Sequence, residues 1–161
     1  MSNVLGKSET KSLKKSETKN ITAEEKKKIG VSETRGKKMK HSYNVKDAEN
    51  ALVMKLKDGE VIIEMFADEA PNHVARIKEL VRQGFYNGLK FHRVIEGFMA
   101  QTGCPLGTGT GGSGKKLKAE FNKIPHKRGI VSMARAMNPD SADSQFFICY
   151  DDCPHLDGQY T

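Results

Sequence analysis

A glycine-rich stretch, GTGTGGSGKK at residues 107–116, has residue types and spacing close to those of a phosphate-binding loop. Gly109–Lys115 fits the pattern G-x-x-x-x-G-K, but a nucleotide site needs Ser or Thr at the next position to hold magnesium, and Lys116 stands there. Such a loop also lies between a buried strand and a helix, whereas Pro105 precedes this stretch and Pro125 interrupts the segment after it. We therefore expect no nucleotide site; the glycines instead allow a tight turn over a neighbouring surface or along a bound chain.

Two other groups of side chains have suitable chemistry but an unsuitable pattern. Cys149, Cys153 and His155 could ligate zinc, yet structural zinc sites usually have a second pair of ligands, which this chain lacks. Ser144 with Asp143 and His155 could form a hydrolase triad, but no nucleophile-elbow pattern surrounds the serine. We interpret the cysteines as buried or incidental thiols and expect neither a metal nor a cofactor.

A hairpin and one helix are the first elements that the sequence predicts. Apolar residues alternate along 52–56 and again along 61–65, on either side of an Asp58-Gly59 pair, which predicts a hairpin with one buried face. Apolar residues at helical spacing then follow Pro71 and end before Gly84, which predicts a single helix.

Four short apolar runs follow the predicted helix: KFHRVI, GFMAQTG, GIVSMARA and SQFFICY. Each is bounded by Gly, Pro, Asn or Asp, a spacing typical of a small antiparallel barrel and not of alternating strands and helices. The predicted fold class is therefore mainly β, with one helix after the hairpin.

The charge of the chain is concentrated at its N-terminus. Residues 1–40 hold 12 of the 27 Lys and Arg and 5 of the 20 acidic residues, so the whole net charge of +7 lies there. This Lys-rich segment repeats the motif SETK, lacks aromatic residues, and has too few apolar residues to offset the entropy of ordering its backbone. We predict a disordered tail over 1–41 and one domain over 42–161, with weak non-specific attachment of the tail to nucleic acid as an open alternative to a merely solvated tail.

Compartment signals are few. The first thirty residues contain no apolar run, and no stretch is long enough to span a bilayer, so we expect neither a secretory segment nor a membrane anchor. The 3 cysteines are an odd number without a disulfide framework. Both observations fit a cytoplasmic protein.

Five segments in one order resemble the cyclophilin-type peptidyl-prolyl cis-trans isomerases: FHRVIEGFMAQTG, GTGTGGSG, RGIVSMARA, SADSQFFICY and HLDGQYT. The similarity runs from about Asn50 to Thr161 and is closest to bacterial-style members, which also carry GTGTGG and HLDGQ. This resemblance implies a cyclophilin-like antiparallel β-barrel with a capping helix. It also implies an enzyme that isomerises X-Pro bonds in flexible chains and assists protein folding.

Isomerisation of an X-Pro bond makes and breaks no covalent bond. Rotation must overcome a barrier of about 18–20 kcal/mol because it disrupts amide resonance. A catalyst needs a pocket for the proline ring, anchors for the flanking backbone and a donor for the lone pair that the twisted proline nitrogen regains. A guanidinium suits the last task, since it is always charged and presents several donors in a fixed fork.

The resemblance assigns catalytic roles to Arg93 and Gln101. A single arginine in a strand is usually a surface residue, but Phe98 and Met99 between these two favour the functional reading. The substrate-binding residues that the resemblance implies are Phe98, Met99, Gly109, Ala134, Arg135, Ala136, Gln145, Phe147, His155, Leu156 and Tyr160.

Alternation along QFFIC predicts which of its side chains reach the site. Successive side chains of a strand point to opposite faces. If Phe147 lies in the proline pocket, Gln145 is on the same face, whereas Phe146 and Ile148 face the barrel interior. We interpret Phe91 as an ordinary core residue as well.

Four residues depart from the common family pattern. Arg135 stands where Asn is frequent, and we expect an altered preference and not a loss of binding. His155 replaces a Trp that packs on cyclosporin in many members, which implies weakened affinity for that drug. Tyr160 replaces a His of the pocket but still offers an apolar face and a hydroxyl, and Glu96 replaces a Pro in a turn.

Family members continue after DGQYT with further strands and a helix, whereas this sequence stops at Thr161. We therefore expect a C-terminally incomplete barrel with open edges, which is marginal alone or must associate. The predicted partners are proline-containing polypeptides. The competing hypothesis is a non-catalytic proline-peptide binding module, or an inactive truncated fragment.

Overall fold

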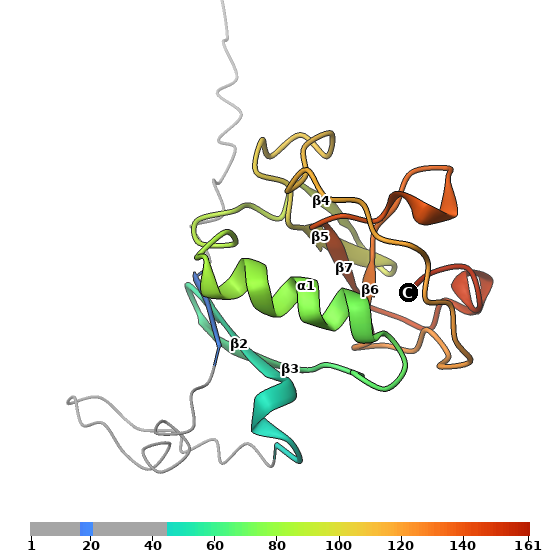
Figure 1. Ribbon diagram of the computed structural model, residues 1–161, viewed down its shortest axis with the longest axis horizontal. Helices are drawn as coiled ribbons and strands as arrows, with labels where there is room; N and C mark the ends of the chain where they lie inside the picture. Colours follow the sequence, from blue (N-terminus) through green and yellow to red (C-terminus); the bar gives the residue numbers. More distant parts are fainter. Residues whose placement is uncertain (1–16, 21–44) are drawn as a thin grey trace, which may run out of the picture.

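The computed structural model describes residues 17–20 and 45–161 (Figure 1). Strands β2 (Ala51–Leu56) and β3 (Gly59–Glu64) form an antiparallel hairpin in which Leu56 pairs with Gly59. The alternation predicts this hairpin correctly, and its buried face carries Leu52, Met54 and Ile63. The turn lies one residue earlier than predicted, at Lys57 and Asp58, because Gly59 already belongs to the second strand.

Helix α1 (Pro71–Arg82) has Pro71 in its first turn, as predicted, and buries Val74, Ile77, Leu80 and Val81. Its N-cap residue, Ala70, has no side chain that could accept a hydrogen bond. The carboxylate of Glu120 takes over this task and accepts hydrogen bonds from the backbone N–H groups of Asn72 and His73, both at 3.0 Å. A negative charge at a helix N-terminus is favourable, since the free N–H groups there carry a partial positive charge.

A second antiparallel sheet has the strand order β4-β5-β7-β6. Its strands are β4 (Arg93–Ile95), β5 (Met99–Thr102), β7 (Phe146–Cys149) and β6 (Val131–Met133). Within residues 17–20 and 45–161, three short 3-10 helices connect other segments: η2 (Ala48–Asn50), η3 (Pro139–Ser141) and η4 (Pro154–Leu156). Each of the four apolar runs predicted after the helix supplies one strand of this sheet.

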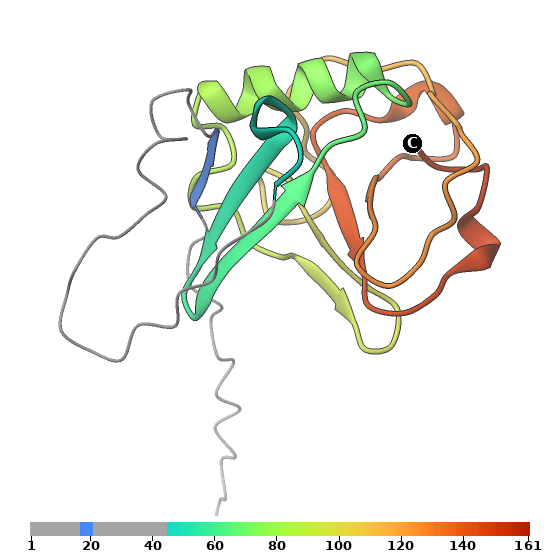
Figure 2. The ribbon, with the colours of Figure 1, turned by 90° about the horizontal axis from the view of Figure 1, so that it is seen from below.

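The main hydrophobic core lies between the hairpin, α1 and one face of the second sheet. Leu52, Ile77 and Phe146 contribute to it from these three parts. Figure 2 shows α1 lying across the space between the hairpin and the second sheet, so that it caps both. The predicted mainly β fold with a capping helix is confirmed.

The barrel is open. Within residues 17–20 and 45–161, no ladder of hydrogen bonds joins the sheet β1-β2-β3 to the sheet β4-β5-β7-β6. This agrees with the expected open edges. No helix in the same residues has the length and apolar character required to cross a membrane.

Strand β1 (Glu17–Asn20) departs from the prediction of a tail without regular structure. It pairs with β2 in an antiparallel register from Glu17 with Lys55 to Asn20 with Leu52. A strand can add to an unpaired sheet edge through main-chain hydrogen bonds, whatever its side chains are. A low content of apolar residues therefore does not exclude such a strand. The rest of the predicted tail, 1–16 and 21–41, lies outside the described residues.

Candidate active site

Three neighbouring strands place the predicted catalytic residues in one row. Arg93 of β4 is the Cα partner of Gln101 of β5, and Gln101 is in turn the partner of Phe147 of β7. Residues directly opposite in antiparallel strands share a face. The sheet therefore presents a guanidinium, an amide and an aromatic ring side by side on the face away from the main core.

A pocket of about 500 Å³ lies over this row and is called the outer pocket below. Ten of the predicted site residues line it: Arg93, Phe98, Met99, Gln101, Gly109, Ala134, Arg135, Phe147, Leu156 and Tyr160. The fold thus brings together residues that are as far apart in the sequence as Arg93 and Tyr160.

Side-chain amides connect Arg93 to the glycine-rich loop. Arg93 Nη1 donates to Gln101 Oε1 at 3.4 Å, and Gln101 Nε2 donates to Gln145 Oε1 at 2.9 Å. Gln145 Nε2 in turn donates to the backbone oxygens of Gly109 and Gly111, at 2.8 and 2.7 Å. Each amide is oriented by its neighbour. Among the residues that the structure describes, the Arg93 side chain bonds only to Gln101, so its other donors can face the outer pocket.

The floor of the outer pocket is apolar. Met99, Phe147 and Leu156 are buried there in a hydrophobic cluster separate from the main core, with Phe98 and Tyr160 packed against it. The ring of Tyr160 meets the ring of Phe147 edge-on at a centroid distance of 5.6 Å. Phe146 and Ile148, by contrast, pack in the main core, which confirms the predicted alternation along β7.

A polar network supports Phe147 from below. The buried ring of His126 stacks on Phe147 at a centroid distance of 6.4 Å. Asp157 accepts hydrogen bonds from the backbone N–H of His126 and from its ring Nδ1, at 2.7 and 3.0 Å, while the ring Nε2 lies 3.0 Å from Ser132 Oγ. The hydrogen bonds from His126 lower the pKa of the Asp157 carboxyl.

Three predicted residues stand outside the lining of the outer pocket. Gln145 acts through its hydrogen bonds to Gln101 and the loop, and Ala136 is exposed, with its N–H bonded to Ser141 Oγ at 2.9 Å. His155 lies against Phe98 with a ring centroid distance of 5.6 Å.

Sequence reasoning missed three lining residues: His92, Thr108 and Thr110. Strict alternation places His92 on the face opposite Arg93, but β4 begins only at Arg93, so alternation does not apply to His92. Burial lowers the pKa of His92 and favours the neutral ring. Its ring packs against Gly109, where an added Cβ would lie 3.4 Å from it.

The glycine-rich loop is filled by acceptors of the protein itself. Asp143 accepts hydrogen bonds from the backbone N–H groups of Ser113 and Gly114, at 2.7 and 3.1 Å. The sulfur of the buried Cys104 accepts from the N–H groups of Gly109 and Gly111, at 3.2 and 3.3 Å. The loop therefore turns over Cys104 and Asp143 of the protein itself.

The hydrogen bonds from the glycine-rich loop to Cys104 also change the pKa of its thiol. Burial raises the pKa of its thiol, but the backbone N–H groups of the loop outweigh burial and lower the pKa to about 7.

Replacing Asp143 by Asn is expected to destabilise the fold at pH 7 by roughly 1.5–3 kcal/mol, the range for hydrogen bonds to a charged group. Burial tends to raise the pKa of Asp143, but hydrogen bonds from Ser113, the charge of Lys116 and the N–H of Gly114 lower it. A lowered pKa means that Asp143 stabilises the fold above the unfolded value of about 3.9, and that this contribution disappears as the pH falls through the folded value.

Urea unfolding of both chains from pH 7 to pH 3 measures the difference. It should be largest at pH 7 and shrink below about pH 4. Asp151→Asn, at an exposed position, is the control and should change little at any pH. A cost of Asp143→Asn that does not depend on pH would contradict the role of its charge.

The cysteines considered as zinc ligands and the serine considered as a hydrolase nucleophile have other roles in the structure. Cys149 and Cys153 are free and buried in the cluster beneath the outer pocket, as interpreted. Ser144 Oγ donates to Gly103 O at 2.8 Å, while Asp143 holds the glycine-rich loop.

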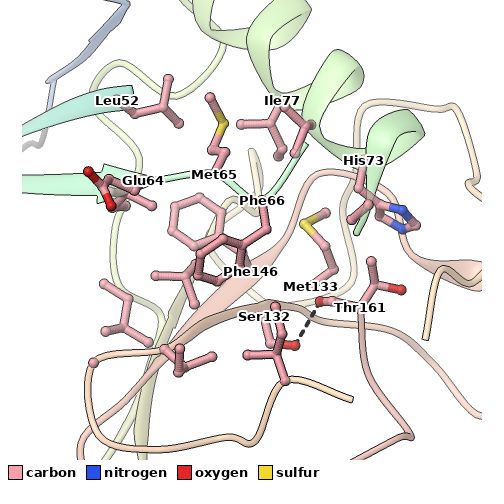
Figure 3. Close-up of a pocket in the computed structure, with 18 of the residues that line it drawn as sticks. Leu52, Glu64, Met65, Phe66, His73, Ile77, Ser132, Met133, Phe146 and Thr161 are labelled. Carbon is pink, nitrogen blue, oxygen red and sulfur yellow. Dashed lines mark hydrogen bonds between the residues drawn. The ribbon is translucent and has the colours of Figure 1, made fainter. Parts of the chain in front are cut away.

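A second, larger pocket of about 690 Å³ lies between the two sheets and is called the inner pocket. Figure 3 shows Leu52 and Ile77 on one side of it and Phe146 and Met133 on the other. Its lining is mainly apolar and includes Thr161, whose backbone oxygen accepts a hydrogen bond from Ser132 Oγ at 2.7 Å. The row of Arg93 and Gln101 is not part of it.

Comparison with known proteins agrees with this geometry. The family model described as cyclophilin type peptidyl-prolyl cis-trans isomerase/CLD matches residues 51–161, which is more than half of the chain. The chain belongs to the cyclophilin family. Among curated cyclophilin relatives, a probable peptidyl-prolyl cis-trans isomerase of Brucella suis is 57% identical over 127 residues, 71% of this chain and 65% of that protein. The peptidyl-prolyl cis-trans isomerase of Helicobacter pylori is 48% identical over 126 residues, 74% of this chain and 77% of that protein.

Solved structures show the same cyclophilin fold. A cyclophilin-type isomerase of Cryptosporidium parvum, crystallised in the presence of the dipeptide Ala-Pro, is 36% identical with a TM-score of 0.62, over 65% of this chain and 70% of that one. The cyclophilin AquaCyp293 of Hirschia baltica is 31% identical with a TM-score of 0.64, over 71% and 62%. The chain spans 65% of the length of the Brucella relatives that it matches.

Proposed function

We propose that this chain is a peptidyl-prolyl cis-trans isomerase that accelerates rotation about X-Pro bonds. The observation that carries the proposal is the row in which Arg93, Gln101 and Phe147 lie side by side across three strands. A charged fork of donors beside an apolar floor is what a twisted prolyl amide requires, since the ring needs an apolar pocket and the nitrogen a donor. The reaction requires no cofactor.

In this proposal the proline ring lies on Met99, Phe147 and Leu156, which form the apolar floor of the outer pocket. Arg93 donates to the proline nitrogen as it becomes pyramidal in the transition state. Gln101 orients Arg93 through the hydrogen bond between their side chains. Such preorganised donors act where they stabilise the transition state more than the ground state.

The remaining predicted residues hold the flanking peptide. Ala134, Arg135 and Gly109 line the outer pocket, and Gln145 fixes the loop that carries Gly109. The Cryptosporidium parvum relative crystallised with Ala-Pro supports a proline peptide as the ligand. The ring of His155 beside Phe98 supports binding of cyclosporin with weakened affinity, because an imidazole offers less apolar area than an indole.

Two-dimensional proton NMR exchange spectroscopy on the peptide acetyl-Ala-Ala-Pro-Phe-amide tests this function. The uncatalysed reaction takes tens to hundreds of seconds, too slow to give cross-peaks between cis and trans signals. Cross-peaks should appear when the chain is added, and circular dichroism should show that the chain is folded. Shifted peptide signals without exchange from a folded chain would overturn the enzyme and leave a proline-peptide binding module.

Further parts of the proposal concern the cell. Assistance to folding of proline-containing chains follows from the reaction, because slow isomerisation can limit folding. Three buried free thiols, Cys104, Cys149 and Cys153, support a reducing compartment such as the cytoplasm. The net positive charge of residues 1–40 supports weak, salt-dependent contact with nucleic acid.

A further inference from the structure

The outer pocket contains two guanidinium groups and no carboxylate. Arg93 and Arg135 both line it, and its other lining residues are uncharged apart from His92. Burial lowers the pKa of His92, which favours the neutral form of this ring. The charge of the pocket is therefore positive.

Arg135 is held in a fixed position by groups that leave its charge uncompensated. Its Nε donates to Gln159 O at 3.1 Å, and its Nη1 donates to the backbone oxygens of Ala136 and Met137, at 2.9 and 3.3 Å. Its guanidinium also lies over the ring of Tyr160, 4.7 Å from the centroid. Carbonyl oxygens and an aromatic face orient a cation but carry no net charge to neutralise it.

Neither arginine of the pocket has an ionic partner within residues 17–20 and 45–161. Two other arginines of that part do have one, since Arg76 pairs with Glu79 at 2.6 Å and Arg82 with Glu49 at 3.4 Å. The Nη2 of Arg135 makes no hydrogen bond with the residues that the structure describes. A fixed cation with an unused donor is ready to bind an anion, because less side-chain entropy is lost when the anion arrives.

We propose that the outer pocket selects proline peptides with a carboxylate side chain next to the proline, and that Arg135 is the residue that recognises it. This proposal rests on the proposed function, in that it names the substrate class of the same pocket. The carboxylate accepts hydrogen bonds from the guanidinium while the proline ring lies on the apolar floor. Because Arg135 is half-buried and water screens part of the attraction, we expect a preference of about tenfold.

Two matched pairs of acetylated peptide amides test the proposal: Ala-Glu-Pro-Phe against Ala-Gln-Pro-Phe, and Ala-Pro-Glu-Phe against Ala-Pro-Gln-Phe. Each pair differs by a charge at nearly constant shape, before or after the proline. The dissociation constants come from titration, and kcat/KM from exchange spectroscopy. In at least one pair, the glutamate peptide should bind about tenfold more tightly at low salt, and the preference should shrink at 0.5 M salt.

Arg135→Gln should bring the glutamate-to-glutamine ratio close to one. Arg128→Gln is the matched control, because it removes the same charge from an exposed side chain that bonds to Tyr150 O outside the pocket, and it should keep the ratio. If Arg135→Gln does not fold, Arg135→Lys keeps the charge without the planar fork and should give an intermediate ratio.

The outcomes separate this inference from the proposed function. Equal affinities within both pairs, with catalysis intact, overturn the preference for an acidic residue and leave the isomerase standing. A tenfold difference in affinity without any exchange supports the preference and overturns the isomerase. A preference that persists unchanged in the Arg135 variants overturns the role of Arg135.

Discussion

Replacing Arg93 by alanine is expected to lower kcat/KM for a proline peptide by about 10²–10³, the usual effect of removing a donor that stabilises a transition state. The side chain of Arg93 is exposed, and its one hydrogen bond with the described residues is the 3.4 Å contact with Gln101. Loss of this side chain therefore leaves the sheet and its core intact. Exchange spectroscopy on the proline tetrapeptide measures the change.

A second variant separates charge from shape at this position. Arg93→Lys keeps the positive charge but loses the planar fork, so its activity should lie between the wild type and Arg93→Ala. Arg82→Ala, at an exposed guanidinium of α1 outside the pocket, should be as active as the wild type. Equal activity of the wild type and Arg93→Ala would show that the row across the sheet is not catalytic.

Gly103→Ala is expected to destabilise the fold by about 3 kcal/mol or more, through overpacking and a strained backbone. A Cβ at Gly103 would lie 2.3 Å from the backbone oxygen of Ser144 and 2.8 Å from the Cα of Gln145. The φ of +87° is a second obstacle, because side chains rarely adopt it. Gly103 lies between β5 and the glycine-rich loop, so the backbone must shift at the edge of the active site.

Gly107→Ala is the matched control for backbone strain alone. Its φ of +66° is also positive, but an added Cβ would meet no atom within 4 Å. We expect this variant to cost only about 1 kcal/mol. The free energies of unfolding of the two variants, measured with urea or heat, should therefore differ by roughly 2 kcal/mol. Equal free energies of unfolding would show that the backbone near Ser144 moves away from the added Cβ at no cost.

Local patterns in the sequence predicted the hairpin, the helix and the strands, whereas the resemblance supplied the residues of the site. Alternation gave the hairpin and the opposite faces of Phe146 and Phe147, because a strand has a period of two residues. Helical spacing gave α1, whose buried face carries the expected residues, but it missed the buried His73. The resemblance supplied the residues that no local pattern selects, such as Tyr160, which packs against Phe147.

Contacts between segments that are distant in the sequence could not be predicted from the sequence. Glu120 binds the N-terminus of α1 across 48 residues, and Asp143 holds the loop at Ser113 across 30. A carboxylate in a loop looks the same in the sequence whether it is solvated or buried. Nor did composition indicate β1, because its pairing with β2 depends on main-chain groups.

The inner pocket has a consequence for the way stability varies with temperature. Phe66 and Val61, which line it, are 48% and 37% exposed in the folded chain. The heat capacity change of unfolding grows with the apolar surface newly hydrated, at about 12–15 cal/mol/K per residue in ordinary domains. Surface that is already hydrated in the folded state adds nothing to this change. Calorimetry of this chain should accordingly show a heat capacity increment below that range, and a curve of stability against temperature that is broader and flatter than that of a domain with a closed core.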